Sequence, residues 1–284
     1  MAVKRWIKLN KINGVAAGGT ATIDLPTDKR YHAIYLEYNT STAGGPTEAN
    51  MEAELTEMRI NIDGVTQRRC SCAQLFDINR TKGKAPVVGS SNGYAIFYFS
   101  EPQRKSHIGR EATAWGMKGV NSFQMEVDIA SGATSPVITG WALVDDVQEA
   151  PLGIVKWKRE TIQVSATGEL THSLDTGRGE SYQGVFLFEN TAGDIDNARL
   201  LWDGTEMYNG DENVQAALIG SSDFTAVSKL FHLPLDYNNP ADAVPMVYRD
   251  RAGNDRRVQE LLLTLTMGGA NNVTAIREVV GTPD

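Results

Sequence analysis

Cysteine is scarce in this sequence, and its scarcity excludes the structural roles that cysteine clusters usually have. The 284 residues contain only Cys70 and Cys72. A pair this close along the chain cannot staple a fold through a disulfide bond, and two thiols without neighbouring histidines fall short of the four ligands of a structural zinc site. We therefore interpret both as small buried or half-buried thiols in a reducing compartment.

Long apolar runs are also missing. Residues 1–8 are basic, as at the start of a signal peptide, but no apolar core of about 7 to 15 residues follows them. The densest apolar segments, residues 94–99 and 261–265, are far shorter than the roughly 18 to 20 residues of a membrane-spanning helix. The sequence predicts neither a secretory signal nor a transmembrane segment.

Positive charge and catalytic groupings are sparse as well. The formal net charge of −8 disfavours a surface that binds nucleic acid by releasing its counterions. The chain has four histidines, and no two of them have metal-ligand spacing or lie where they would activate a cysteine nucleophile. We expect no nucleic-acid partner and no enzyme.

The sequence does contain an internal repeat. Residues 31–38 (Tyr-His-Ala-Ile-Tyr-Leu-Glu-Tyr) return 151 positions later as residues 182–189 (Tyr-Gln-Gly-Val-Phe-Leu-Phe-Glu). Trp6 likewise has a counterpart 151 positions later, Trp157. Because the similar segments follow in the same order, one structural unit is predicted to occur twice in the chain.

A second echo supports two domains of similar size. Residues 59–64 (Arg-Ile-Asn-Ile-Asp-Gly) correspond to residues 199–204 (Arg-Leu-Leu-Trp-Asp-Gly). The pattern breaks near residues 149–153, immediately before Trp157 restarts it. We therefore predict one domain at residues 1–150 and another at residues 151–284.

Alternating apolar patterns predict eight short strands in each half. In the first half they are residues 4–12, 20–25, 31–38, 58–63, 94–100, 112–116, 123–129 and 137–144. In the second half they are residues 154–164, 169–174, 182–189, 198–203, 229–235, 244–248, 258–267 and 273–280. One short helix per half, at residues 71–80 and 211–219, is expected between the fourth and fifth strands. The pattern indicates an all-β fold of two tandem eight-stranded antiparallel jelly rolls, each with one short helix.

Two connections in the first half have distinct signals. Asp63-Gly64 is a dipeptide suited to the positive φ angles of a tight hairpin turn. Residues 39–50 are rich in Gly, Thr, Ser and Ala, which predicts a loop. The corresponding connection in the second half, residues 190–197, is shorter.

Acidic residues gather in predicted loops of the second half. Asp194, Asp196, Asp211 and Glu212 are carboxylates in irregular backbone, the kind of oxygen ligand that calcium prefers. None of them follows the spaced calcium-loop signature, and Asp211 and Glu212 also suit a helix N-terminus. A solvated acidic surface is the favoured interpretation, and a calcium site is the alternative.

Basic residues gather near the N-terminus, at Lys4, Arg5, Lys8 and Lys11. One interpretation is the polar face of an exposed strand. The other is a membrane-facing foot that rests on anionic lipid headgroups, where each basic residue contributes about 1 kcal/mol.

The repeated architecture resembles a known family. Residues 15–20 (Val-Ala-Ala-Gly-Gly-Thr), 31–38 and 60–64, with the echoes of the last two, are similar to the double-jelly-roll major capsid proteins of membrane-containing icosahedral phages, of the corticovirus (PM2-like) type within the PRD1–adenovirus lineage. The resemblance covers nearly the whole chain.

The resemblance carries expectations about assembly. It implies a structural coat protein whose homotrimers are pseudo-hexagonal tiles of an icosahedral shell over an internal lipid membrane. It also implies vertex (penton) proteins and minor membrane proteins as partners, contact with lipid headgroups, and calcium in some members. The expected location is the virion capsid, after synthesis and assembly in the host cytoplasm.

Two alternatives use the same fold. A glycan-processing hydrolase with two jelly rolls would need carboxylates over an aromatic floor, for which the candidates are Trp141, Trp202, and Glu206 or Asp203. A trimeric phage spike or carbohydrate-binding module is the other alternative.

Overall fold

The computed structural model describes residues 3–89, 91–150, 152–177, 179–236, 242–250 and 252–284. Two compact units divide the chain: the first contains the residues up to Trp157 together with Pro283 and Asp284, and the second contains Lys158–Thr282. The predicted boundary segment includes Pro151, which lies outside the described residues. The division at 150/151 therefore stays a prediction.

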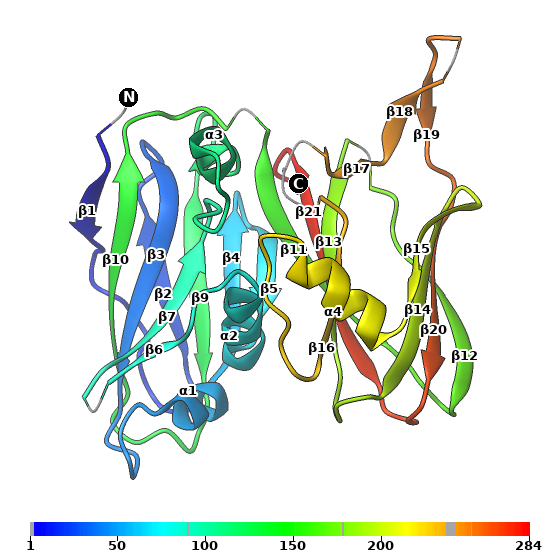
Figure 1. The fold of residues 1–284 in the computed structure, drawn as a ribbon. Helices are drawn as coiled ribbons and strands as arrows, with labels where there is room; N and C mark the ends of the chain where they lie inside the picture. Colours follow the sequence, from blue (N-terminus) through cyan, green and yellow to red (C-terminus); the bar gives the residue numbers. More distant parts are fainter. Residues whose placement is uncertain (1–2, 90, 151, 178, 237–241, 251) are drawn as a thin grey trace. The chain divides into compact units, whose positions relative to one another are not determined.

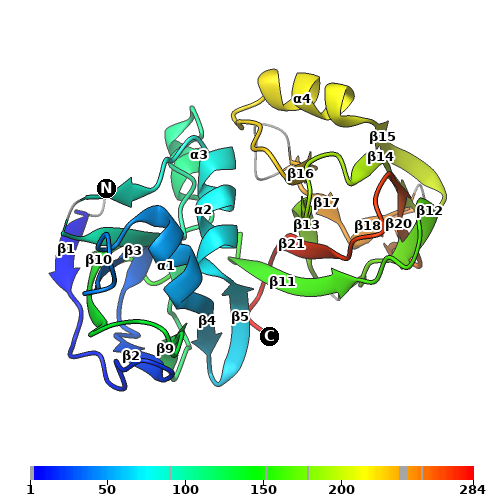
Figure 2. The ribbon, with the colours of Figure 1, turned by 90° about the horizontal axis from the view of Figure 1, so that it is seen from below.

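The first unit is a sandwich of two antiparallel sheets (Figure 1). One sheet has the order β1-β10-β3-β7-β6, with β8 paired to β3. Its strands are β1 (Arg5–Lys8), β3 (Arg30–Asn39), β6 (Val87–Val88), β7 (Gly93–Tyr98), β8 (Trp115–Gly116) and β10 (Val137–Asp145). The facing sheet has the order β5-β4-β9-β2. Its strands are β2 (Thr20–Leu25), β4 (Leu55–Ile62), β5 (Val65–Cys70) and β9 (Phe123–Ile129). Figure 2 shows these two layers end-on.

The core of the first unit is aromatic. Strand β9 alternates between buried and half-buried residues along its whole length, because one of its faces packs on the core. The rings of Phe99 and Trp115 lie 4.7 Å apart, and Tyr31 contacts Phe123 edge-on at 4.9 Å. Each such ring buries about 150–250 Å², so these contacts dominate the packing of the two sheets.

The second unit repeats this sandwich. One sheet has the order β16-β13-β21-β11, with β17 paired to β13, and the facing sheet has the order β12-β20-β14-β15. The strands are β11 (Ile154–Ile162), β12 (Gly168–Ser173), β13 (Ser181–Phe188), β14 (Ile195–Trp202), β15 (Thr205–Gly210), β16 (Leu230–Pro234), β17 (Val244–Pro245), β20 (Leu261–Met267) and β21 (Val273–Gly281). A separate hairpin joins β18 (Val247–Arg249) to β19 (Asp255–Arg257). The order of strands matches that of the first unit, so the predicted pair of all-β jelly rolls is confirmed.

The repeat extends to single hydrogen bonds at the β4–β5 and β14–β15 hairpins. Asp63 and Asp203 have φ angles of 49° and 45°, and each is followed by a glycine of positive φ, as the predicted tight turn requires. The Asp63 carboxylate accepts hydrogen bonds from the backbone N–H groups of residues 121 and 122, and the Asp203 carboxylate accepts them from those of residues 259 and 260. Each hairpin also has a β-bulge at the equivalent place, directly after Ile60 in β4 and directly after Leu200 in β14.

One strand in each roll differs from the prediction. Strands β5 and β15 are not among the sixteen predicted strands, which include residues 112–116 and 244–248. The structure has only the two-residue β8 in the former segment, and β17 with the start of β18 in the latter. The sequences of β5 (Val-Thr-Gln-Arg-Arg-Cys) and β15 (Thr-Glu-Met-Tyr-Asn-Gly) lack apolar alternation, which hides them from pattern analysis. The helix of each roll therefore follows the fifth strand.

The helices begin where the sequence predicts a cap. Helix α2 (Cys72–Thr81) has Ser71 as its N-cap in a full capping box, and α4 (Glu212–Gly220) has Asp211. Among the described residues, the first unit has two further helices: α1 (Glu48–Glu54), which begins in the predicted loop, and α3 (His107–Glu111). In the described part of the chain, no helix has the length and apolar character needed to cross a membrane.

Candidate assembly surfaces

One outer face of the first unit is covered by ion pairs. On β4, Arg59 donates hydrogen bonds to Glu126 at 2.8 Å and to Asp128 at 2.7 Å. The hydrogen bond from Arg59 holds the pKa of Asp128 below its ordinary value. Glu57 accepts from both Arg59 and Arg69. A face that neutralises its own charges in this way suits exposure to water.

The opposite outer face is aromatic instead. Several large aromatic and apolar side chains of β1, β3, β7 and β10 point away from the core, and we call this set the aromatic face. Its members are Trp6, Tyr35, Tyr94, Tyr98, Trp141 and Leu143. Trp6 is 55% exposed, and its ring contacts Tyr35 edge-on at 4.8 Å. An antiparallel sheet normally turns polar side chains outward, so the aromatic face has the character of a contact surface.

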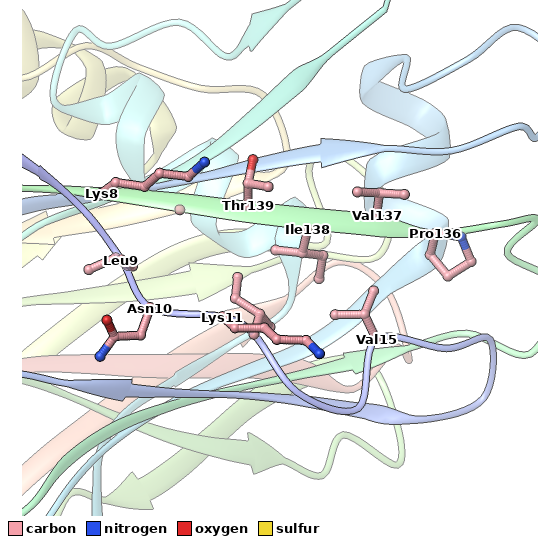
Figure 3. Close-up of a pocket in the computed structure, with 11 residues that line it drawn as sticks. Lys8, Leu9, Asn10, Lys11, Val15, Pro136, Val137, Ile138 and Thr139 are labelled. Atoms are coloured by element: carbon pink, nitrogen blue, oxygen red, sulfur yellow. The ribbon is translucent and has the colours of Figure 1, made fainter.

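A groove of about 530 Å³ lies beside the end of β1 (Figure 3). Its lining is largely apolar and includes Leu9, Ile12, Val15 and Ile138, with Lys8 and Lys11 at its rim. Strand β1 pairs with β10 only as far as Lys8, after which the Leu9 N–H still donates to the Gly140 carbonyl at 2.8 Å. The first residues of β10 therefore present an open strand edge to the groove.

The four basic residues predicted to face lipid fall into two pairs. Lys4 forms an ion pair with Glu111 at 2.7 Å, and Arg5 donates two hydrogen bonds to Asp146, at 2.7 and 3.1 Å. Lys8 and Lys11 are exposed, and neither has an ion pair within the described residues. The lipid-facing role of all four stays a prediction.

The acidic calcium candidates lie at two places in the second unit. Asp194 is buried beside β14 and accepts hydrogen bonds from the Thr191 N–H and the Asn271 amide, whereas Asp196 is exposed. Asp211 caps α4, where the backbone N–H of Val214 lowers its pKa, and Glu212 is exposed in the first turn. Within the described ranges no three His, Cys, Asp or Glu side chains gather closely enough to hold a metal. The calcium role stays a prediction.

The hydrolase candidates have structural contacts. Trp141 belongs to the aromatic face of the first unit, and Trp202 packs against Tyr248 at 4.8 Å in the second. Asp203 holds the β14–β15 turn through its carboxylate, while Glu206 is exposed on β15 and accepts a hydrogen bond from Asn209.

The sequence pattern does not reveal a buried cation at the edge of the first unit. The guanidinium of Arg68, on β5, lies 4.5 to 5.0 Å from the ring centroids of Phe99, Trp115 and Trp157. It donates hydrogen bonds to the carbonyl oxygens of Tyr98 at 2.7 Å and Val155 at 2.8 Å. The start of β11, which belongs to the first unit, is thereby fixed in parallel along β5, with Trp157 opposite Arg68.

A buried ion cluster at the end of β10 was also missed. The Asp145 carboxylate accepts hydrogen bonds from Arg30 at 2.6 Å and from the Val147 N–H at 2.9 Å, and it contacts His32 Nε2 at 2.8 Å. Burial raises the pKa of Asp145, but the hydrogen bonds outweigh that effect and hold it below the ordinary value. Burial lowers the pKa of His32. These contacts link the start of β3 to the end of β10, in the same sheet as β1.

Comparisons with solved structures identify the class of this architecture. The chain superposes on the major capsid protein P2 of bacteriophage PM2 with a TM-score of 0.81, covering 98% of this chain and 97% of that one at 18% identity. It is also similar to a chain in the Sulfolobus turreted icosahedral virus (TM-score 0.67, 12% identity, 99% and 91% covered). A chain of the PBCV-1 virus capsid gives a TM-score of 0.65 (12% identity, 98% and 93% covered). The fold is the double jelly roll of viral capsid proteins.

Sequence comparisons identify the family. Residues 6–148 match the viral coat protein P2 N-terminal domain, and residues 154–283 match the viral coat protein P2 C-terminal domain. The major capsid protein P2 of Pseudoalteromonas phage PM2 is 22% identical over 209 residues, which cover 72% of each chain. The chain belongs to the viral coat protein P2 family. It is a structural capsid protein of the virion, and the comparisons support neither the hydrolase nor the spike alternative.

Proposed function

We propose that the chain forms homotrimers that act as pseudo-hexagonal tiles of an icosahedral shell over an internal lipid membrane. The observation that carries this proposal is the aromatic face, because a coat protein is the kind of molecule that covers such a face with neighbouring copies. An obligate interface of this kind buries more than roughly 2,000 Å². The proposed partners also include vertex proteins and minor membrane proteins, and the proposed site of assembly is the host cytoplasm.

The trimer is tested by the mass of the purified protein in solution. We expect light scattering to give about 93 kDa, three times the 31.0 kDa of one chain. Negative-stain images of the same sample should show a hexagonal outline, since three copies supply six similar jelly rolls. A particle of a single chain's mass at micromolar concentration would contradict the proposal.

The lipid contact rests on Lys8 and Lys11, the two basic residues of the four without an ion pair in the described chain. We expect the protein to co-sediment with anionic liposomes at low salt and to be released at high salt, because salt screens exposed charges. Lys11→Ala should weaken binding about fivefold, which corresponds to about 1 kcal/mol for one basic residue. Lys118→Ala, on an exposed lysine paired with Glu149, is the matched control. Equal recovery with neutral and anionic liposomes would exclude the contact.

A further inference from the structure

The contact between β11 and β5 supplies a template for association. Within the first unit, Trp157 lies opposite Arg68 on a parallel strand and is only 3% exposed. The neighbouring Gln67 on β5 is fully buried. Within the first unit, β5 is thus covered along its edge by the start of β11.

Strands β1 and β15 correspond to β11 and β5 in the repeat, but they are not paired with each other in the way that β11 is paired with β5. Trp6 on β1 is the equivalent of Trp157, and β15 is the equivalent of β5, with the same turn and the same bulge. Both β1 and β15 are edge strands of their sheets. Trp6 is 55% exposed, and Met207, the equivalent of Gln67, is 40% exposed. Each strand therefore exposes an apolar side chain where its equivalent is buried.

We propose that β1 of one copy lies parallel along β15 of a neighbouring copy, with Trp6 opposite Tyr208, and so repeats the contact between Trp157 and Arg68. This inference rests on the proposed trimer and names the surfaces that form it. Because the contact joins the first unit of one copy to the second unit of another, it is head-to-tail. Contacts of that kind close into rings when the rotation permits, as a trimer requires.

The charges along the two strands agree with this register. If the register of the Trp157–Arg68 pair continues two residues toward the N-terminus of each strand, Lys4 on β1 comes beside Glu206 on β15. Two residues after the tryptophan, the equivalent position on β1 is Lys8, which comes beside Gly210. The next residues of that chain are Asp211 and Glu212, of which Glu212 is exposed. Lys8 therefore comes near the exposed carboxylate of Glu212, whereas Lys4 already pairs with Glu111. The charge match at the Lys8 end favours this register over a shifted one.

The first test removes the exposed tryptophan. Trp6→Ala should raise the protein concentration at which half of the trimers dissociate by about 30-fold, the effect of losing an interface hot spot. Val137→Ala is the matched control, since Val137 is 54% exposed on the same sheet, and it should leave that concentration unchanged. Circular dichroism should show that both variants fold, because neither side chain belongs to the core.

The second test reverses the charges at one end of the contact. Lys8→Glu and Glu212→Lys should each weaken the trimer about tenfold, and the double variant should recover most of the loss. Lys11→Glu, at the rim of the same groove but beyond β1, should have no effect on the trimer.

The outcomes separate this inference from the proposed function. Wild-type protein that never forms a trimer would overturn both. Trimers that are indifferent to Trp6→Ala, or a double charge variant no better than its single variants, would overturn the β1–β15 contact alone.

Discussion

Replacing Arg68 by alanine should lower the free energy of unfolding of the first unit by about 3–5 kcal/mol. The change leaves the carbonyl oxygens of Tyr98 and Val155 without their donor, and it opens a cavity between three aromatic rings. It also releases Trp157 from β5, so the start of β11 loses its anchor. Urea unfolding at matched protein concentration, followed by tryptophan fluorescence, measures the loss.

The neighbouring residue is the control for this prediction. Arg69 lies on the same strand, but its side chain is 53% exposed and pairs with Glu57. Arg69→Ala should cost about 0–1 kcal/mol, as is usual for an exposed ion pair. Similar losses for the two variants would show that Arg68 does not anchor β11.

Replacing Asp145 by alanine should destabilise the first unit by a similar amount, about 3–5 kcal/mol. The change removes the carboxylate that lies 2.6 Å from the buried Arg30 guanidinium, which keeps only Glu111 at 3.5 Å, and it removes the partner of His32. Asp146→Ala is the matched control, because Asp146 is exposed and an exposed ion pair such as those with Arg5 and Lys29 contributes about 0–1 kcal/mol. Thermal unfolding of the two variants, compared at neutral pH, measures the difference.

The same cluster predicts how stability depends on pH. Burial lowers the pKa of His32 in the folded protein. Below about pH 6.5 the unfolded chain therefore binds a proton that the folded chain does not, and stability decreases as the pH is lowered. The pKa of Asp145 is also lowered, so its contribution is present above about 3.9 and is lost as pH falls through the folded value. His32→Gln, which introduces the residue found at the equivalent position 183, should remove the first loss. A variant with the wild-type slope near pH 6 would contradict this assignment.

The sequence predicts those parts of the fold in which local chemistry and the global pattern agree. Ser71 and Asp211 carry short polar side chains that satisfy the first N–H groups of a helix, so both helix starts are visible without a structure. Asp63 and Gly64 accept positive φ angles, so the hairpin turn is visible too. The tandem repeat and the resemblance to double-jelly-roll coat proteins follow from such local features in a fixed order.

Strand β5 could not be predicted because its burial depends on residues far away in sequence. Arg68 is 2% exposed only because Trp157 and Trp115 cover its guanidinium. In a local pattern, Gln-Arg-Arg indicates an exposed loop. Helix α1 was missed for a related reason, since its fully buried Met51 packs against Gly93, the first residue of β7, far away in sequence.

The candidate site residues were chosen by charge, and charge alone does not reveal the partner. Lys4 and Arg5 have acidic partners in the first unit, and Asp211 serves α4 as a cap. The more informative feature is the difference in exposure between Trp6 and Trp157. Sequence comparison shows that the two are equivalent, but only coordinates show that one of them lacks a cover.

Two copies of one jelly roll make a building block whose open edge strands, β1 and β15, pair with those of neighbouring copies in the proposed trimer. Cryo-electron microscopy of the purified assembly tests this most directly. It should show a threefold particle of six sandwiches in which Trp6 of each chain is covered by β15 of the next. A particle without threefold symmetry, or one in which Trp6 remains in solvent, would contradict the account.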